Sequence, residues 1–395
     1  MSGTPHRDGA RLVGIDLARF VAVAGMMAAH TLRVRDEELP AGVVALIDGP
    51  PSTLFAVLGG VSVVLASRSR LAIGDRRGAV RSLLVRGLAI VLLGLLVIPF
   101  ASAVYVVLVP FGVAIMAAAL LVLLRTWQLA VLAALLTAGS GWIVALAHDR
   151  LPGLERSHSL EQLFRNPLGS VNDVLLNGVY PALTWIAYLT IGILLARALL
   201  AGRRVGRERR TLVALAGVGA VLVAAGIAAS EAGLRLLARG DVAAARESLL
   251  ANAYGGAPSL EPAWQLLAAP HSGTPADIAR TGGIALLAIA LLGLLASALP
   301  ATVLRVIEPV RAAGGAPLTI YVVHIVLLST MGGLLIGVAP GLVRGWGAWA
   351  LQVAVALGIG AVLAAHGTRG PFERVVGRLA SRAGGLHEAG EPRRS

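Results

Sequence analysis

The sequence contains no cysteine and no lysine among its 395 residues. Without cysteine, the chain can form no disulfide, no thiolate metal site and no cysteine nucleophile. All 34 basic residues are arginine, which is typical of a GC-rich genome. The spacings HxxxH and HExxH are missing, so we expect no metal site. No Walker or GxGxxG pattern opens a soluble helix, which argues against ATP-driven transport.

Charged residues are scarce as well. They make up 14% of the chain, whereas hydrophobic residues make up 57% and the mean hydropathy is +0.81. The apolar runs are long and alternate little with polar residues, which indicates α-helices rather than a membrane barrel. We therefore expect an all-α, polytopic integral membrane helix bundle in a lipid bilayer. The first apolar run is followed by an acidic patch without a small-residue cleavage site, so we expect no cleavable signal peptide.

About ten apolar stretches have the length needed to span a bilayer. They lie at residues 12–32, 51–67, 83–102, 104–124, 127–147, 179–200, 211–234, 279–299, 315–338 and 346–367. Arginine clusters fall mainly in alternate connections, which places both termini in the cytoplasm by the positive-inside rule. We therefore expect a multi-pass membrane protein with cytoplasmic termini. The same rule accounts for most of the net charge of +13, so we expect no nucleic-acid partner.

The domain organisation is simple. We expect a single transmembrane domain over residues 1–367, in which the long outer connections, 148–178 and 235–278, form folded caps or re-entrant segments. Residues 368–395 are rich in Arg, Gly and Glu. We expect this segment to be a basic cytoplasmic tail with little structure of its own.

The first apolar run, RLVGIDLARFVAVAGMMAAH at residues 11–30, carries three ionisable side chains: Asp16, Arg19 and His30. At about 100° per residue, spacings of three and eleven place them on one face of a helix. A charged side chain at the centre of a bilayer costs about 2.5–3.5 kcal/mol on insertion scales, so such groups are paired or functional. Asp16 and Arg19 either neutralise each other and hold helices together, or Asp16 orients Arg19 toward an anionic ligand entering from the cytoplasm.

Histidines near the outer side are the candidate catalytic residues. His30 lies near the outer end of the first span, where packing is the alternative role. His271 belongs to PHSGT at 270–274, a composition that an exposed turn would also explain. The topology puts both histidines on one side of the membrane. Facing a common cavity, they could serve as general base and as donor to a developing oxyanion.

Four further side chains are candidates for binding an acceptor substrate. Ser272 and Thr274 flank His271 in the polar turn, and no GxSxG elbow supports Ser272 as a nucleophile. His324 and Tyr321 lie in the ninth span, where packing or a polar lining is the plainer interpretation. Glycines within the spans most simply permit close helix approach; these are Gly59, Gly60, Gly112 and Gly192.

Several stretches of the chain carry a family resemblance. The pattern RLxxxDxxR followed by His30 resembles the first helix of the heparan-α-glucosaminide N-acetyltransferase family, and it is similar to the opening LDxLR…H of acyltransferase family three. Further stretches resemble bacterial members of this group: NGVYPALTWIAYLTIGILLAR at 177–197, APHSGTPADIARTGG at 269–283, GGAPLTIYVVHIVLL at 314–328 and GPFE at 370–373.

The resemblance implies transfer of an acyl group, commonly acetyl, from cytoplasmic acyl-CoA to an acceptor across the membrane, such as an envelope sugar or lipid. It also implies a location in the bacterial plasma membrane. Asp16, Arg19 and His30 carry over from the family pattern. Arg19 and Arg86 are candidates to bind the CoA phosphates at the inner mouth. Lysosomal relatives have asparagine at the position of His30, and most relatives have glycine at the position of Phe20. Direct transfer and an acyl-histidine intermediate both remain open.

Two other functions fit the same residues. In a transporter or flippase, Asp16, Arg19, His30 and His324 would line a substrate or proton path, although we find no convincing internal repeat. A structural partner that has kept the fold and lost activity is the third alternative. A homodimer is compatible with the sequence.

Overall fold

The computed structural model describes residues 6–32, 39–101, 104–151 and 160–385. Within these ranges the regular structure is helical, and nine helical segments are long and apolar enough to cross a membrane. The long helices are α1 (His6–Leu32), α3 (Pro50–Ala72), α4 (Arg76–Val97), α6 (Thr126–Arg150), α9 (Ala182–Arg204), α10 (Glu208–Ala238), α13 (Pro275–Ala298), α16 (Pro317–Leu335) and α17 (Gly345–Ala365). The prediction of an all-α, polytopic bundle is confirmed.

One of the ten predicted spans, the fourth at 104–124, is a shorter helix. It is α5 (Leu108–Leu121), with 14 residues. Tertiary hydrogen bonds hold the residues that flank α5 at both ends of the helix. The N–H of Val107 donates to the hydroxyl of Tyr321 at 3.2 Å, and the carbonyls of Val122 and Leu124 accept from Arg197 at 2.9 and 2.8 Å. The sequence pattern alone overestimates this helix because it contains no sign of these distant partners.

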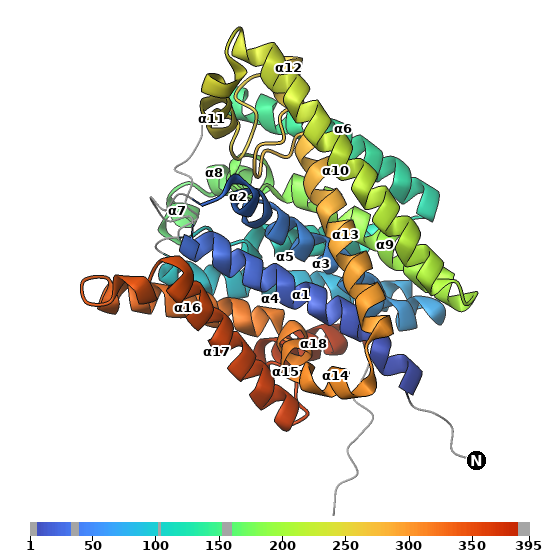
Figure 1. Cartoon of the computed structure of the whole chain (residues 1–395). Coiled ribbons are helices and arrows are strands. Elements are labelled where there is room, and N and C mark those ends of the chain that lie inside the picture. The colour runs from blue at the N-terminus through green and yellow to red at the C-terminus, as the bar shows by residue number, and fades with distance from the viewer. Residues whose placement is uncertain (1–5, 33–38, 102–103, 152–159, 386–395) are drawn as a thin grey trace, which may run out of the picture.

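Short helices gather at the two ends of the bundle (Figure 1). One end, which we call the arginine end, carries α14 (Ala301–Val306), α15 (Glu308–Gly314) and α18 (Pro371–Ala383). The other, which we call the histidine end, carries α2 (Ala41–Ile47), α7 (Leu160–Arg165), α8 (Pro167–Asn172), η2 (Asp173–Asn177), α11 (Val242–Asn252) and α12 (Pro262–Gln265). The single-turn helices η1 (Ile98–Phe100) and η3 (Pro340–Leu342) complete the set.

The expectation of a tail with little structure is wrong for residues 371–383, which form α18. This helix buries Val376 and Ala380. Its Ser381 carbonyl accepts a hydrogen bond from Arg70 of α3 at 3.2 Å. Glu373, from the GPFE motif, accepts from the N–H of Leu318 at 2.6 Å and so caps the start of α16. Side-chain contacts thus attach α18 to the bundle. Residues 386–395 of the predicted tail lie outside the described residues.

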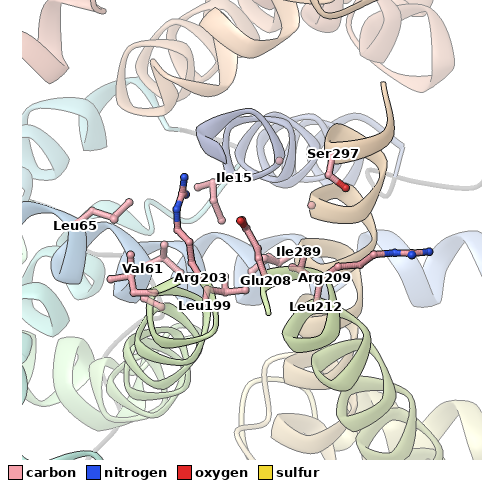
Figure 2. Close-up of a pocket in the computed structure, with 14 residues that line it drawn as sticks. Ile15, Val61, Leu65, Leu199, Arg203, Glu208, Arg209, Leu212, Ile289 and Ser297 are labelled. Atoms are coloured by element: carbon pink, nitrogen blue, oxygen red, sulfur yellow. The ribbon is translucent and has the colours of Figure 1, made fainter. Parts of the chain in front are cut away.

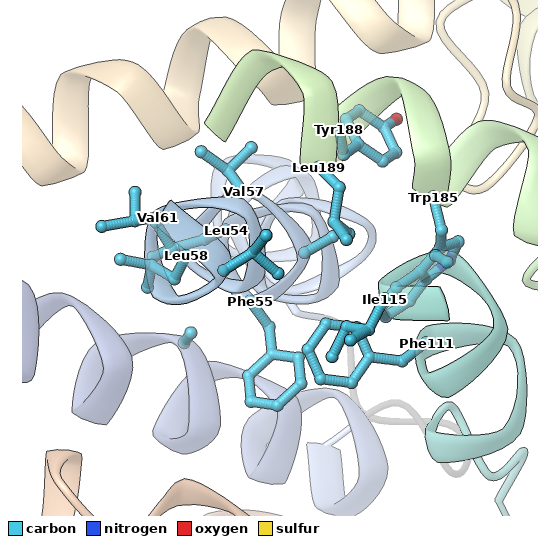
Figure 3. Close-up of a cluster of buried hydrophobic side chains, with 14 of the residues drawn as sticks. Leu54, Phe55, Val57, Leu58, Val61, Phe111, Ile115, Trp185, Tyr188 and Leu189 are labelled. Atoms are coloured by element: carbon cyan, nitrogen blue, oxygen red, sulfur yellow. The ribbon is translucent and has the colours of Figure 1, made fainter. Parts of the chain in front are cut away.

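Helix α3 lies at the centre of the main hydrophobic core. Figure 3 shows its apolar side chains packed against those of α5 and α9. The prediction that glycines permit close helix approach is confirmed here. A Cβ added at Gly60 would lie 2.1 Å from the carbonyl oxygen of Leu189, and one at Gly192 would lie 2.0 Å from that of Val57. Added Cβ atoms at Gly59 and Gly112 would likewise meet neighbours at 2.5 and 2.6 Å. Backbone contact between α3 and α9 therefore depends on Gly60 and Gly192.

Candidate active site

Helix α1 runs from the arginine end to the histidine end (Figure 1) and carries ionisable side chains near both. Toward the arginine end, Arg19 donates to Asp16 at 2.8 Å and to the hydroxyl of Ser62 at 3.0 Å. Arg311 of α15 lies 3.6 Å from the other Asp16 oxygen. Asp16 is thus held between two arginines in a buried setting.

Helix α15 is positioned for this contact by its own sequence. Arg311 also forms two hydrogen bonds with Glu308, which raise the pKa of Arg311 and keep its guanidinium charged. Gly314 ends the helix directly against α1, where an added Cβ would overlap the carbonyl oxygen of Asp16. The predicted pairing of Asp16 with Arg19 therefore belongs to a network of three helices: α1, α3 and α15.

A cavity of about 390 Å³ opens beside this network, at the arginine end. Gly14 and Ile15 of α1 line it on one side, and apolar side chains of α3, α9, α10 and α13 line the rest. Figure 2 shows Arg203 and Glu208 reaching into the space between the helices, whereas Arg209 points away. An apolar cavity with an arginine in its lining suits a ligand that combines an apolar arm with an anionic group.

Arg86 is not among the residues that line this cavity. It lies on α4, where the like charge of Arg369, near the start of α18, repels its guanidinium. Its buried Nε has no hydrogen-bond partner within the described ranges. The structure thus keeps Asp16 and Arg19 together, whereas Arg86 forms no hydrogen bond or ion pair with either of them within the described ranges.

At the histidine end, His30 meets the imidazole of His324. Nδ1 of His30 lies 2.8 Å from Nε2 of His324, and Nδ1 of His324 lies 2.9 Å from the side-chain oxygen of Gln352. His324 and Gln352 are 1% and 2% exposed, and His30 is half-buried. Trp349 donates to the carbonyl of Ala24 at 3.0 Å, which fixes α17 against α1 one turn from Gln352.

His271 occupies a second site at the same end. Its backbone has a positive φ of 60°, an unusual conformation for a residue other than glycine. Its Nε2 lies 3.4 Å from a carboxylate oxygen of Asp48. The rings of Tyr180 and Tyr254 pack edge-on against it, with centroids 4.8 and 5.4 Å away. Such strain, held by packing on two sides, is often found at functional sites.

Ser272 and Thr274 are buried and hold the turn that carries His271. Their hydroxyls lie 3.2 Å apart, and Thr274 also donates to the carbonyl of Leu267 at 2.6 Å. Thr274 caps the start of α13 by accepting from the N–H of Asp277. These hydroxyls therefore bond within the protein, and a role in substrate binding stays a prediction.

His271 lines a small polar cavity of about 10 Å³, together with Asp277, Tyr188 and other residues. This is room for one water molecule. Oδ2 of Asp277 accepts a hydrogen bond from the N–H of Gly273. Oδ1 of Asp277 is buried without a hydrogen-bond partner in the described structure. His30 does not line this cavity. It is near enough to His271 for an electrostatic interaction, so the two histidines occupy neighbouring sites.

Sequence reasoning missed Gln352, Asp48 and Asp277. Gln352 is an amide within a membrane-spanning segment, which is the usual signal of a functional polar group. Asp277 lies within the motif APHSGTPADIARTGG, and Asp48 precedes the turn before α3. Tyr321 is fully buried, and its hydroxyl is hydrogen-bonded by the N–H of Val107. In the described ranges, no group of three or more His, Asp or Glu side chains could hold a metal ion.

Comparison with known proteins gives one family. The family model described as "Heparan-alpha-glucosaminide N-acetyltransferase, catalytic" matches residues 11–227. A search of curated proteins found no match. The matched range begins with the first residues of the RLxxxDxxR pattern and includes Asp16, Arg19 and His30.

Proposed function

This chain belongs to the family of the heparan-α-glucosaminide N-acetyltransferase catalytic domain, and on that basis we propose how it works. It takes an acetyl group from acetyl-CoA at the arginine end and transfers it to an amine or hydroxyl group at the histidine end. The acceptor is a sugar or lipid of the cell envelope. The observation that carries the proposal is that one helix, α1, lines the cavity at one end and presents His30 at the other.

The cavity at the arginine end supports the donor half of the proposal. Acyl-CoA combines a long flexible arm with phosphate groups, and the cavity combines apolar walls with Arg203 in its lining. Arg19 and Asp16 hold the part of α1 that provides Gly14 and Ile15 to the wall. In this proposal Arg19 and Arg86 supply further positive charge near the CoA phosphates.

His30 supports the acceptor half. The acceptor nitrogen or oxygen attacks the thioester carbonyl carbon, so a C–N or C–O bond forms and the C–S bond breaks. Nε2 of His30 takes the proton of the acceptor, and the CoA thiolate later takes up a proton as it leaves. His271, beside Asp48, donates a hydrogen bond to the oxyanion that develops on the carbonyl oxygen. His324 and the PHSGT turn complete the surroundings of the acceptor.

The proposal also assigns an orientation. The arginine end faces the cytoplasm, where acyl-CoA is made, because it carries Arg70, Arg203 and Arg311 together with the arginines of α18. The histidine end then faces the outside of a bacterial plasma membrane.

We expect the His30→Ala variant to lose acetyl transfer and to keep donor binding. General-base catalysis contributes about 10²–10⁴-fold, so the rate should fall by at least a hundredfold. The assay follows radiolabelled acetyl from acetyl-CoA to glucosamine or methyl glucoside with purified protein in detergent. Donor binding is read as the thermal stabilisation that acetyl-CoA produces.

The matched control is His366→Ala. His366 is exposed at the end of α17, where its Nδ1 lies 2.9 Å from the carbonyl of Val362. This variant should keep the wild-type rate. A full rate in His30→Ala, or no stabilisation of the wild type by acetyl-CoA, would contradict the proposed function.

A further inference from the structure

Three helices that are far apart in the sequence contribute one hydrogen-bonded chain at the histidine end. His30 comes from α1, His324 from α16 and Gln352 from α17. The two links measure 2.8 and 2.9 Å, both within the range of good hydrogen bonds. The family match ends at residue 227, so two of the three members lie beyond it.

The direction of each hydrogen bond follows from the chemistry of the groups. The side-chain oxygen of Gln352 can only accept, so Nδ1 of His324 must carry the hydrogen. A neutral imidazole has a single N–H, which leaves a lone pair on Nε2 of His324. Nδ1 of His30 must then donate to that lone pair. Nε2 of His30 is consequently left with a lone pair, which is the form that a general base needs.

The ring geometry fits this pattern. The planes of His30 and His324 differ by 5° and their centroids are 5.1 Å apart. The 2.8 Å contact between nitrogens is shorter than the roughly 3.5 Å of van der Waals contact between ring faces. The rings therefore meet edge to edge, as an N–H···N hydrogen bond requires.

Burial of His324 and Gln352 keeps this series of hydrogen bonds in place. His324 and Gln352 have almost no exposed surface, so water does not compete for their hydrogen bonds. Trp349 anchors α17 to α1 through the carbonyl of Ala24. In contrast, His30 is half-buried, and no described side chain or backbone group hydrogen-bonds to its Nε2.

We infer that Gln352 and His324 are positioning residues that fix His30 in the tautomer with its lone pair on Nε2. When His30 takes a proton at Nε2, its Nδ1–H bond to His324 becomes charge-assisted, and His324 shares the positive charge. The inference about the tautomer stands on the geometry alone. The catalytic consequence rests on the proposed function.

The test combines tautomer spectroscopy with kinetics. Nitrogen NMR of protein labelled with ¹⁵N-histidine, recorded at a pH where the imidazoles are neutral, distinguishes Nδ1–H from Nε2–H. Variants at His30 and His324 assign their signals among the eight histidines of the chain. In the wild type we expect both residues to carry the hydrogen on Nδ1.

Two substitutions at one position separate the hydrogen bond from the packing. Gln352→Leu removes the acceptor and should abolish both Nδ1–H signals. It should lower kcat at least tenfold while KM for acetyl-CoA changes less than twofold. Gln352→Glu retains an acceptor oxygen and should retain both signals and most of kcat. The control is Gln128→Leu, the same change at a glutamine that caps α6 through Arg125, and it should leave signals and rate unchanged.

The outcomes separate the two proposals. If wild-type His30 or His324 carries its hydrogen on Nε2, the inferred tautomer is wrong, whatever the activity. If Gln352→Leu loses the signals but keeps kcat, the positioning role is overturned. If the wild type shows the expected tautomers but transfers no acetyl group to either acceptor, the proposed function fails while the tautomer stands. Should Gln352→Leu fail to fold, the wild-type spectrum and Gln352→Glu still decide the inference.

Discussion

Asp16 shows how a carboxylate is accommodated within a membrane-spanning helix. Its two oxygens face Arg19 at 2.8 Å and Arg311 at 3.6 Å, and its side chain is 9% exposed. Two cations near one buried anion offset much of the cost of removing these groups from water. Replacing either Asp16 or Arg19 should nevertheless be costly, because the charge that remains stays buried without its nearest partner.

This sensitivity gives a prediction at the scale of single residues. Asp16→Ala and Arg19→Ala should each lower the free energy of unfolding by about 3–5 kcal/mol. The double variant should lose less than the sum, because no unpaired charge is left behind. The free energy of unfolding of each variant is measured in mixed micelles.

The control for this cycle is the exposed pair of Glu231 and Arg246, whose side chains are 39% and 45% exposed at a separation of 2.7 Å. Breaking it should cost less than about 1 kcal/mol. Strictly additive losses at Asp16 and Arg19 would show that the two residues do not stabilise each other.

At the residue scale, local spacing predicts some contacts and not others. Asp16 and Arg19 are three apart on one helix, so their pairing follows from helical geometry. His30 and His324 are 294 residues apart, and only the packing of α16 against α1 brings them together. Nothing in the sequence around Gln352 identifies its partner. Sequence therefore predicts which side chains are unusual, but the structure supplies the neighbours that give them a role.

At the scale of elements, close packing of α3 against α9 holds the core together. The backbone of each helix contacts a glycine of the other, at Gly60 and Gly192. A hydrophobic pattern predicts that both helices exist, and glycine within a span predicts close approach. The sequence does not predict which helix packs against which glycine, because all the spans are apolar on most faces.

We expect Gly60→Ala to destabilise the protein. The new Cβ would lie 2.1 Å from the carbonyl oxygen of Leu189, so α3 and α9 must move apart, at a cost of about 1–3 kcal/mol. Gly139→Ala is the matched control, because an added Cβ on this α6 residue meets nothing within 4 Å. Thermal unfolding in detergent compares the two, and equal melting temperatures would mean that the helices are not in backbone contact.

The end helices show a further limit of sequence patterns. Residues 371–383 have too few apolar residues to span a membrane, so the composition of this segment is like that of a solvated tail. The structure shows that Val376 and Ala380, one turn apart, are buried against the bundle, whereas Val375 and Leu379 are exposed. Glu373 in turn satisfies backbone N–H groups at the start of α16, which would otherwise lack partners. Periodicity within the segment was therefore more informative than its composition.

At the scale of the whole molecule, the C-terminal part completes the site that begins on α1. The family match covers residues 11–227, which include His30 and much of the cavity lining. Arg311, His324 and Gln352 come from later helices and contact the α1 side chains directly or through one another. The arginine end and the histidine end are therefore each built from both parts of the chain. A transporter would use the same polar groups to move a solute, whereas the proposed enzyme moves only an acetyl group.

The sides of the membrane on which the donor is used and the product appears distinguish the enzyme from a transporter. They also test the central claim most directly. The chain lacks cysteine, so a single Arg378→Cys substitution on the exposed face of α18 reports its orientation in vesicles through an impermeant maleimide. Labelled acetyl-CoA is added outside vesicles in which α18 faces outward, and glucosamine is trapped inside. We predict labelled N-acetylglucosamine inside these vesicles and none with His30→Ala. Product that forms only when donor and acceptor share one side of the membrane would contradict transmembrane transfer.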